Sequence, residues 1–574
     1  MKRNSEDIPN KPAAGDGVAE ERKSASQADP GANAIDAAPE THTGKHYQRA
    51  ILPVEPLAKD PETDEIPIVP NSEVLASLHK VELAVSVDDA HLIDNIGKQH
   101  QVDYISSEQV KLHQGIHPLN WIFANPARLI AVSFAMLILL GGVLLSLPVA
   151  SNAGVWTSFL TSIFTAASAV CVTGLVLVDT AAYWSVFGHV VIITLIQLGG
   201  IGLITVVAAF FSLTKKRMNI KTLRAVQDST ASDSVAEVYS LVKRVLMITL
   251  SFEIIGGLIL SLRYTRYLPA AKAFYIGMFQ GVSAFCNAGF DLMGGWTGEY
   301  SSLTALNADP IVTMTTTLLL TFGGMGFIVW IDIFNFRKNR KLMFHSKLVI
   351  GLTASIILLG TVLFLILEWS NQGSQAMGTL PTWQKPLAAL FQAATLRTAG
   401  FNTINQANLR DVSKLLSILI MFVGASPVST GGGMKTTTVA IVLATLRSNV
   451  QGKKEAVLAR HKISQEIFTR AFVITIMGMM VVMAVSLLLM ITERKALADG
   501  LYSAMDLVFE SMSAVGTVGV TAVQTENISS WGRIPLIFAM YIGRVGPFSF
   551  ALLLSMRSQK PENVVLPDGL TFIG

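Results

Sequence analysis

Four short stretches of the chain combine small, hydroxyl-bearing and apolar residues, and each closes on a glycine followed by an apolar residue. Their glycines, Gly174, Gly289, Gly400 and Gly519, are separated by 115, 111 and 119 residues. The third stretch needs a one-residue gap to align with the others. A fixed period with the same internal order indicates duplication of one structural unit. The stretches read FTAASAVCVTGL (164–175), FQGVSAFCNAGF (279–290), FQAATLRTAGF (391–401) and FESMSAVGTVGV (509–520).

The chemistry that such stretches offer is the presentation of backbone carbonyl oxygens to an ion. We expect each to form a short helix and then a few extended residues, because glycine tolerates the positive φ values that turn carbonyls toward one axis. Rings of carbonyl oxygens can replace the water shell of a cation, and the C-terminal end of a helix is partially negative. Because the stretches need no acidic side chain near the axis, the pattern favours a site for a monovalent cation over a carboxylate ring for divalent ions. Helix packing alone would explain one such glycine, but not four equivalent ones.

A further stretch, STGGGMKTTT (429–438), places three glycines and a lysine between two apolar runs. A phosphate-binding P-loop needs a glycine directly before its lysine, whereas Met434 separates Gly433 from Lys435 here. Pro427 and the glycines oppose helix formation. We therefore predict that a membrane helix breaks over residues 424–433.

Apolar runs of membrane-spanning length surround these stretches. Of the 574 residues, 51% are hydrophobic and only 15% are charged, and about 20 apolar residues cross a bilayer as a helix. The sequence predicts an all-α polytopic membrane protein in which each copy holds a long helix, the short stretch and a second long helix. The apolar runs are Leu129–Val149, Trp184–Phe211, Val245–Leu262, Ile311–Trp330, Leu348–Leu367, Ala471–Ile491 and Ile534–Leu554.

Charge placement predicts the orientation. Clusters of Lys and Arg at 215–224, 337–347 and 447–462 divide the membrane part into four copies, and short basic loops stay in the cytoplasm. Stretches 151–163, 176–183 and 291–310 contain no Lys or Arg. Both termini are therefore expected in the cytoplasm, and the short stretches enter the membrane from outside. Irregular backbone at that depth must line a polar cavity, so four re-entrant stretches around one axis predict a pore.

The remaining composition adds three expectations. Residues 1–115 are polar and rich in Pro, Ala and Gly, which predicts a largely disordered cytoplasmic extension. The first apolar run begins near residue 129, so no cleavable signal peptide is expected. Two cysteines, Cys171 and Cys286, offer no disulfide framework. They take equivalent places in two stretches, and we interpret them as packing residues.

Together with GGMGF (323–327), STGGGMK (429–435) and GRVGP (543–547), these stretches resemble the membrane subunit of the Ktr/Trk/HKT superfamily of potassium transporters, most closely the Ktr type. The resemblance covers roughly residues 120–574. It implies four M1–P–M2 repeats, with eight transmembrane helices and four re-entrant pore loops around one ion path, in the plasma (inner) membrane. It also implies a homodimer, gated by a cytosolic nucleotide-binding ring subunit. The expected segments are 120–213, 235–336, 344–448 and 463–556, with a cytoplasmic tail at 557–574.

By position, the resemblance assigns a potassium filter, a gate loop and one residue of the inner cavity. In plant relatives, serine at the first filter glycine accompanies sodium transport, so Gly174 favours potassium. K⁺ is the expected substrate, Na⁺ a possible stimulator, and neither a bound cofactor nor nucleic acid is expected. The filter residues are Val172, Thr173, Gly174, Asn287, Ala288, Gly289, Thr398, Ala399, Gly400, Thr517, Val518 and Gly519. The gate residues are Ser426, Pro427, Ser429, Thr430, Gly431, Gly432, Gly433 and Lys435, and the cavity residue is Arg544.

Some charged residues need placing. Arg397 would repel a cation at the axis, so we expect it to turn outward and pair with Glu510. Arg544 lies mid-helix, where an ionisable group is costly and usually functional. Glu253 and Asp332 are expected nearer helix ends or interfaces, in structural roles.

Two other classes of protein compete with the pore. A sodium-coupled solute carrier would also use a broken helix, but within two inverted repeats. An enzyme would need a motif such as HExxH or GxSxG with partners, and none is present. Sodium coupling, channel-like or carrier-like flux, and the nucleotide sensed by the ring stay open.

Overall fold

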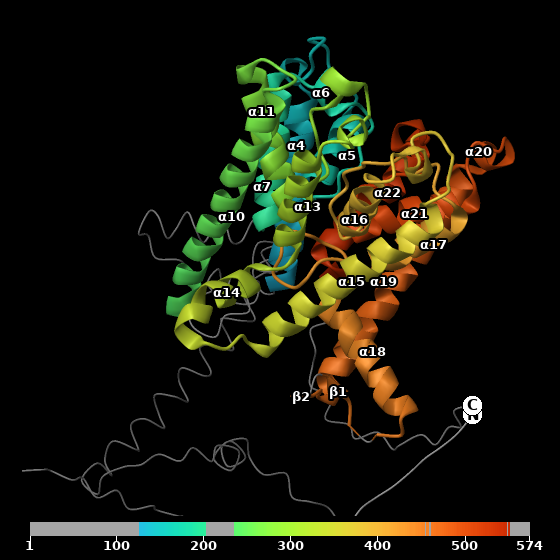
Figure 1. The fold of residues 1–574 in the computed structure, drawn as a ribbon. Helices are drawn as coiled ribbons and strands as arrows, with labels where there is room; N and C mark the ends of the chain where they lie inside the picture. Colours follow the sequence, from blue (N-terminus) through green and yellow to red (C-terminus); the bar gives the residue numbers. More distant parts are fainter. Residues whose placement is uncertain (1–125, 203–234, 454, 459–460, 548, 551–574) are drawn as a thin grey trace, which may run out of the picture. The chain divides into compact units, whose positions relative to one another are not determined.

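The computed structural model describes residues 126–202, 235–453, 455–458, 461–547 and 549–550 (Figure 1). All of them belong to one compact unit, Ile116–Gly574. The expectations for residues 1–115, for the basic cluster at 215–224 and for the tail at 557–574 lie outside the described residues. Within the described part the fold is helical, apart from one hairpin in which β1 (Val457–Leu458) pairs antiparallel with β2 (His461–Lys462).

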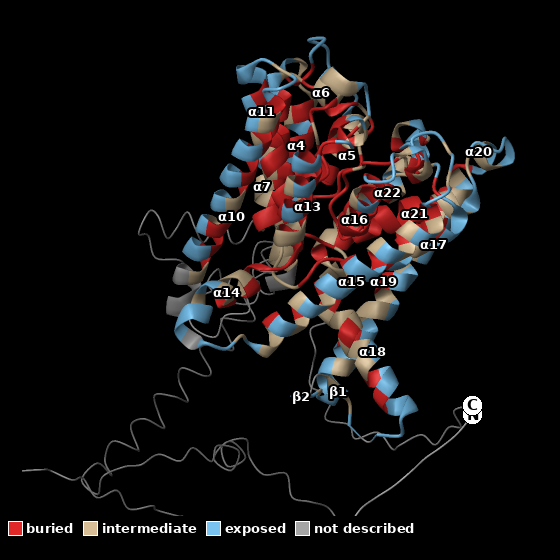
Figure 2. Ribbon diagram, in the orientation of Figure 1, coloured by how far each residue is buried: buried red, intermediate tan, exposed pale blue. Residues whose placement is uncertain are grey.

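Four long helices form the outside of the unit. Among the described residues, these four helices are each long and apolar enough to cross a membrane. A bent pair of helices, α13 (Pro310–Gly324) and α14 (Phe327–Asn339), would add a fifth span. Their outward faces carry exposed Leu140, Leu258, Leu359 and Met480, in the pale blue regions of Figure 2. Lipid is the solvent that suits such surfaces. The helices are α4 (Pro126–Ser146), α10 (Val235–Tyr264), α15 (Phe344–Glu368) and α19 (Gln465–Thr492).

Four short helices pack inside them, each against the long helix that precedes it. Figure 2 shows them largely buried. Glycine pairs allow the close approach: Gly142 of α4 faces Ile163, and Gly257 of α10 faces Met278 at the matching position. These helices end where the four repeated stretches reach their final residues. They are α5 (Phe159–Val170), α11 (Ala270–Phe285), α16 (Lys385–Thr395) and α21 (Ala504–Gly516).

The second helix of each copy is shorter than predicted. The prediction of unbroken helices over the runs 184–211, 311–330 and 534–554 is wrong. The helices α7, α13 and α22 each end one or two residues before a glycine with a positive φ, of 89°, 95° and 93° respectively. These glycines, Gly202, Gly326 and Gly546, hold a conformation that a helix cannot include. The second helices are α7 (Val186–Ile201), α13 (Pro310–Gly324), α17 (Asp411–Phe422) and α22 (Ser530–Val545).

Two of these breaks are described on both sides. After α13, the chain bends by 96° into α14 (Phe327–Asn339), and the Phe327 N–H donates to Val428 O at 2.8 Å instead of continuing the helix. In the third copy α17 ends at Phe422 and α18 (Thr436–Val450) begins 14 residues later. The break predicted over 424–433 is confirmed. The count of eight transmembrane helices stays a prediction.

Short elements connect the long ones. They are η2 (Pro148–Ala150), α6 (Thr180–Tyr183), α12 (Gly294–Thr297), η3 (Thr304–Leu306), η4 (Met377–Thr379), α20 (Arg494–Ala498) and η5 (Thr525–Asn527).

Candidate functional site

The four predicted glycines meet in one ring, in chain order. A methyl group built on Gly174 would lie 2.7 Å from Ala288 O, one on Gly289 would lie 3.0 Å from Ala399 O, and one on Gly400 would lie 2.8 Å from Val518 O. Gly519 closes the ring, because its methyl would collide with Thr173 O. Each glycine thus touches a carbonyl oxygen of a neighbouring copy. We call the 12 residues 172–174, 287–289, 398–400 and 517–519 the candidate filter.

The candidate filter has the same backbone conformation in all four copies. The ring glycines have φ values from 71° to 95°. The residues two positions before the ring glycines have φ values from 50° to 70°, a region that residues with a side chain seldom adopt. They are Val172, Asn287, Thr398 and Thr517. The predicted extended conformation is therefore corrected to an alternation of left-handed and extended residues. Strain that recurs at four equivalent positions marks a functional site.

The helices α5, α11, α16 and α21 anchor this conformation. Thr173, Ala288 and Val518 donate their N–H to the carbonyl five residues earlier, whereas Ala399 donates four residues back to Thr395. The one-residue gap of the third copy therefore lies at the end of α16. Sequence reasoning missed a further contact: Ser168 and Ser513 accept the N–H of Gly174 and Gly519, each at 3.0 Å. A serine six residues before the glycine was the available signal.

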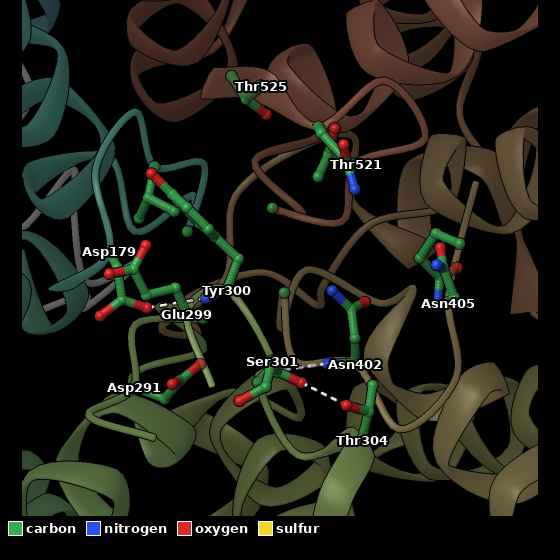
Figure 3. Close-up of a pocket in the computed structure, with 18 of the residues that line it drawn as sticks. Asp179, Asp291, Glu299, Tyr300, Ser301, Thr304, Asn402, Asn405, Thr521 and Thr525 are labelled. Carbon is green, nitrogen blue, oxygen red and sulfur yellow. Dashed lines mark hydrogen bonds between the residues drawn. The ribbon is translucent and has the colours of Figure 1, made fainter. Parts of the chain in front are cut away.

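A cavity of about 400 Å³ opens on one side of the ring, with all four ring glycines among its lining residues. Its wall is acidic: Asp179, Asp291, Glu299 and Glu526 contribute, and none of the lining residues is basic. Figure 3 shows Asp179, Asp291 and Glu299 on one side of this cavity, and Thr521 and Thr525 across from them. Such a wall attracts cations.

Local structure fixes two of these carboxylates. Asp179 caps α6 by accepting the Ala182 N–H at 2.8 Å, and it accepts the Tyr300 N–H at 2.9 Å. Asp291 accepts the Met293 N–H at 3.0 Å. Burial raises the pKa of the Asp291 carboxyl to about 6, because desolvation disfavours the charged form. Asp291 therefore changes charge close to physiological pH.

The opposite side of the ring is covered by the glycine-rich segment, residues 424–435, which joins α17 to α18. A methyl group on Gly431 would collide with the Thr398 hydroxyl, and one on Gly432 would collide with the Thr517 hydroxyl. The Thr430 hydroxyl donates to Phe285 O, at the end of α11, at 3.0 Å. The segment therefore touches three copies directly beneath the candidate filter, and only glycines fit at two of these contacts.

Backbone and hydroxyl contacts hold this segment against the second copy. Ser426 and Thr430 donate their N–H groups to Gly324 O at 3.0 Å and Gly323 O at 3.3 Å. The Ser426 and Thr436 hydroxyls lie 3.1 Å apart. Backbone and hydroxyl groups therefore both hold the segment in this position.

Two basic residues share this side of the ring. The Lys435 ammonium donates to Gly431 O at 2.9 Å. The Arg544 guanidinium donates to Thr430 O and Gly199 O, and to Gly200 O at 3.1 Å. Arg544 therefore ties the first and fourth copies to the glycine-rich segment from beneath.

Comparison with known proteins gives one consistent result. The family model described as TrkH, cation transport protein, matches residues 142–564. The chain belongs to the TrkH family. It is therefore a membrane transporter and not an enzyme.

Individual relatives agree with this membership. Ktr system potassium uptake protein B of Bacillus subtilis is 34% identical over 456 residues, covering 79% of this chain and 98% of the relative. Potassium/sodium uptake protein NtpJ of Enterococcus hirae is 33% identical, with coverages of 78% and 97%. The crystal structure of the potassium transporter TrkH from Vibrio parahaemolyticus has a TM-score of 0.57 at 15% identity, covering 74% of this chain and 84% of that chain. At that identity it supports the fold alone.

Within this TrkH-family fold, the remaining expectations have mixed outcomes. Cys171 and Cys286 are both free and buried, but packing alone does not describe Cys286, because its thiol also donates a hydrogen bond. The Arg397–Glu510 pair is wrong: no ion pair joins them in the described chain, and the Glu510 carboxyl accepts the Thr525 hydroxyl at 2.6 Å instead. Glu253 lies in the middle of α10, at an interface with Gln197 of α7 and with Cys286.

Proposed function

We propose that this chain takes up K⁺ through the candidate filter, and that the glycine-rich segment controls the flow. The observation that carries the proposal is the closed ring in which four copies contribute the same strained backbone and adjoining carbonyl oxygens. Carbonyl oxygens suit a weakly hydrated monovalent cation. The relatives named as potassium uptake proteins support K⁺ as the ion.

The glycine-rich segment supports the gating part of this proposal. It lies against Thr398 and Thr517, so an ion leaving the ring on that side would meet it. The segment lacks helical hydrogen bonds over its middle, and a small number of backbone and side-chain hydrogen bonds hold it. A segment of this kind can move without unfolding the helices beside it.

The finer assignments rest on family resemblance. We propose four M1–P–M2 repeats in the plasma membrane with both termini cytoplasmic, a homodimer, and control by a cytosolic nucleotide-binding ring subunit. Three relatives are named as Ktr system proteins, which supports an assembly with further subunits. The relative named for potassium and sodium uptake supports Na⁺ as a stimulating or accompanying ion.

Rubidium uptake in a cell that lacks its own potassium transport tests this function. The wild-type chain should support Rb⁺ uptake that excess K⁺ blocks, more strongly with a cognate ring subunit. Gly174→Ser should lower the preference for K⁺ over Na⁺ about tenfold, which corresponds to about 1.4 kcal/mol, because a side chain at this φ displaces Ala288 O. Unchanged selectivity after substitution of every one of the four ring glycines would refute the filter. Repeating the assay with and without Na⁺ decides the role of sodium.

A further inference from the structure

A buried carboxyl group lies behind the second segment of the candidate filter. Glu253 of α10 is 2% exposed. The Gln197 amide of α7 donates to both of its oxygens at 3.0 Å. The Cys286 thiol lies within hydrogen-bond reach of two acceptors, Glu253 Oε1 at 3.5 Å and Gln197 Oε1 at 3.6 Å. Cys286 directly precedes Asn287, so Glu253 connects two membrane helices to the start of the filter segment.

This group has no ion-pair partner in the described chain, where four ion pairs join other residues. Burying a carboxyl group inside a membrane protein costs free energy, and residues that carry this cost usually have a function. Its neighbours are instead amide and thiol donors, which orient it without neutralising it.

The first copy shows that packing does not require a carboxyl group here. Gly141 and Gly256 both face a leucine of the second helix, Leu195 and Leu319. This equivalence places Ile138 at the position of Glu253, three residues before the glycine. Ile138 is a buried apolar residue. Cys171, which matches Cys286, is also buried, and its thiol makes no hydrogen bond within the described residues. An aliphatic side chain therefore fills this place in the same fold.

We infer that Glu253 is a positioning residue that sets the ion selectivity of the candidate filter; the inference rests on the proposed function. By accepting from Cys286 and Gln197, it fixes the end of α11 where the chain turns into the left-handed residue Asn287 (φ 59°). That turn determines where the carbonyls of residues 287–289 point. Acceptor geometry, rather than charge, performs this task.

The test compares Rb⁺ and Na⁺ uptake by membrane-inserted variants beside the wild-type chain. Glu253→Leu, which is aliphatic like Ile138 of the first copy, should lower the Rb⁺/Na⁺ ratio about tenfold, the size expected from losing buried hydrogen bonds. Glu253→Gln keeps an acceptor oxygen and should remain within about twofold of wild type. Cys286→Ala should lower the ratio at least about threefold more than Cys171→Ala, because only Cys286 loses a hydrogen bond.

Three results would overturn the inference: a wild-type ratio in inserted Glu253→Leu, an equal loss in Glu253→Gln, or equal effects of the two cysteine variants. If Glu253→Leu does not insert, the cysteine pair decides alone. Absence of Rb⁺ uptake by the wild-type chain would instead refute the proposed function, so the two failures are distinguishable.

Discussion

The two sides of the candidate filter differ in charge and in structure. On one side, the cavity wall contributes Asp179, Asp291, Glu299 and Glu526, and it is open. On the other side, the glycine-rich segment contacts Thr398 and Thr517, and the cations Lys435 and Arg544 bond to that segment. We propose that one side attracts a cation and that the other obstructs it.

Under the proposed function, the two sides have separate tasks, as follows. The acidic side raises the local concentration of cations without touching the filter, so its charges should affect apparent affinity. The basic side controls whether an ion can leave, so changes there should affect the maximal flux. The labelling prediction below tests the orientation, and each later prediction alters one side; all of them leave the ring glycines intact.

An all-or-none effect is expected from labelling. A membrane-impermeant thiol reagent should label Thr297→Cys, beside the acidic cavity, in intact cells, and it should not label Asp60→Cys or Lys338→Cys. Cys171 and Cys286 are fully buried, so they add little background. Labelling of Lys338→Cys from outside would reverse the proposed orientation.

Deleting residues 426–432 should raise K⁺ flux by about tenfold, equivalent to lowering the barrier by about 1.4 kcal/mol, because the contacts beneath the ring disappear. Selectivity should persist, since the ring is untouched, and flux should depend less on the ring subunit. Ser429→Ala is the matched control, because the Ser429 hydroxyl bonds only within the segment, to Ser426 O. Inserted deletion protein with lower flux or lost selectivity would show that the segment is not a gate.

Arg544→Gln should raise flux by roughly fivefold, because the lost hydrogen bonds stabilise the closed position of the segment by about 1 kcal/mol. Arg544→Lys keeps the positive charge but lacks the planar guanidinium that donates to several carbonyl oxygens at once. This variant therefore distinguishes the effect of the charge from that of the hydrogen-bond geometry. Flux of Arg544→Lys equal to wild type would mean that the charge alone matters. The measurement is initial Rb⁺ uptake at saturating Rb⁺.

Neutralising Glu299 and Glu526 together should raise the K⁺ concentration for half-maximal uptake about threefold at low ionic strength, with unchanged maximal flux. The effect should vanish at high ionic strength, because salt screens exposed charges. Neither carboxylate accepts a hydrogen bond from a described side chain, so folding should be unaffected. A change that persists at high salt would contradict a field effect.

The smallest effect concerns pH. Because the pKa of Asp291 is raised to about 6, its carboxylate is charged above pH 6 and loses its charge as the pH falls through that value. Apparent K⁺ affinity should therefore fall about twofold between pH 7.5 and 5.5. Asp291→Asn should show the low-pH affinity at both pH values. Equal pH dependence of this variant and the wild-type chain would exclude Asp291 as the cause.

The sequence by itself determined the features that are encoded locally. Repeated order and spacing identified the four stretches and the ring glycines, and Pro427 with Gly431–Gly433 located the break of the third copy. These predictions hold because conformational preference and duplication are properties of short segments. The same reasoning failed for the second helices, where Gly326 stood beside Gly323 and Gly324 inside an apolar run. Glycines in such a run do not show which of them adopts a positive φ.

Only the tertiary structure decided which distant residues meet. Arg544 bonds to Gly199 across 345 residues of sequence, and Glu253 meets Gln197 and Cys286 across 56 and 33 residues. The acidic cavity draws its carboxylates from three copies, none of which shows a charge cluster of its own. Such contacts depend on how the copies close around one another, and the energy of that closure comes from packing between copies. No local pattern in the chain records it.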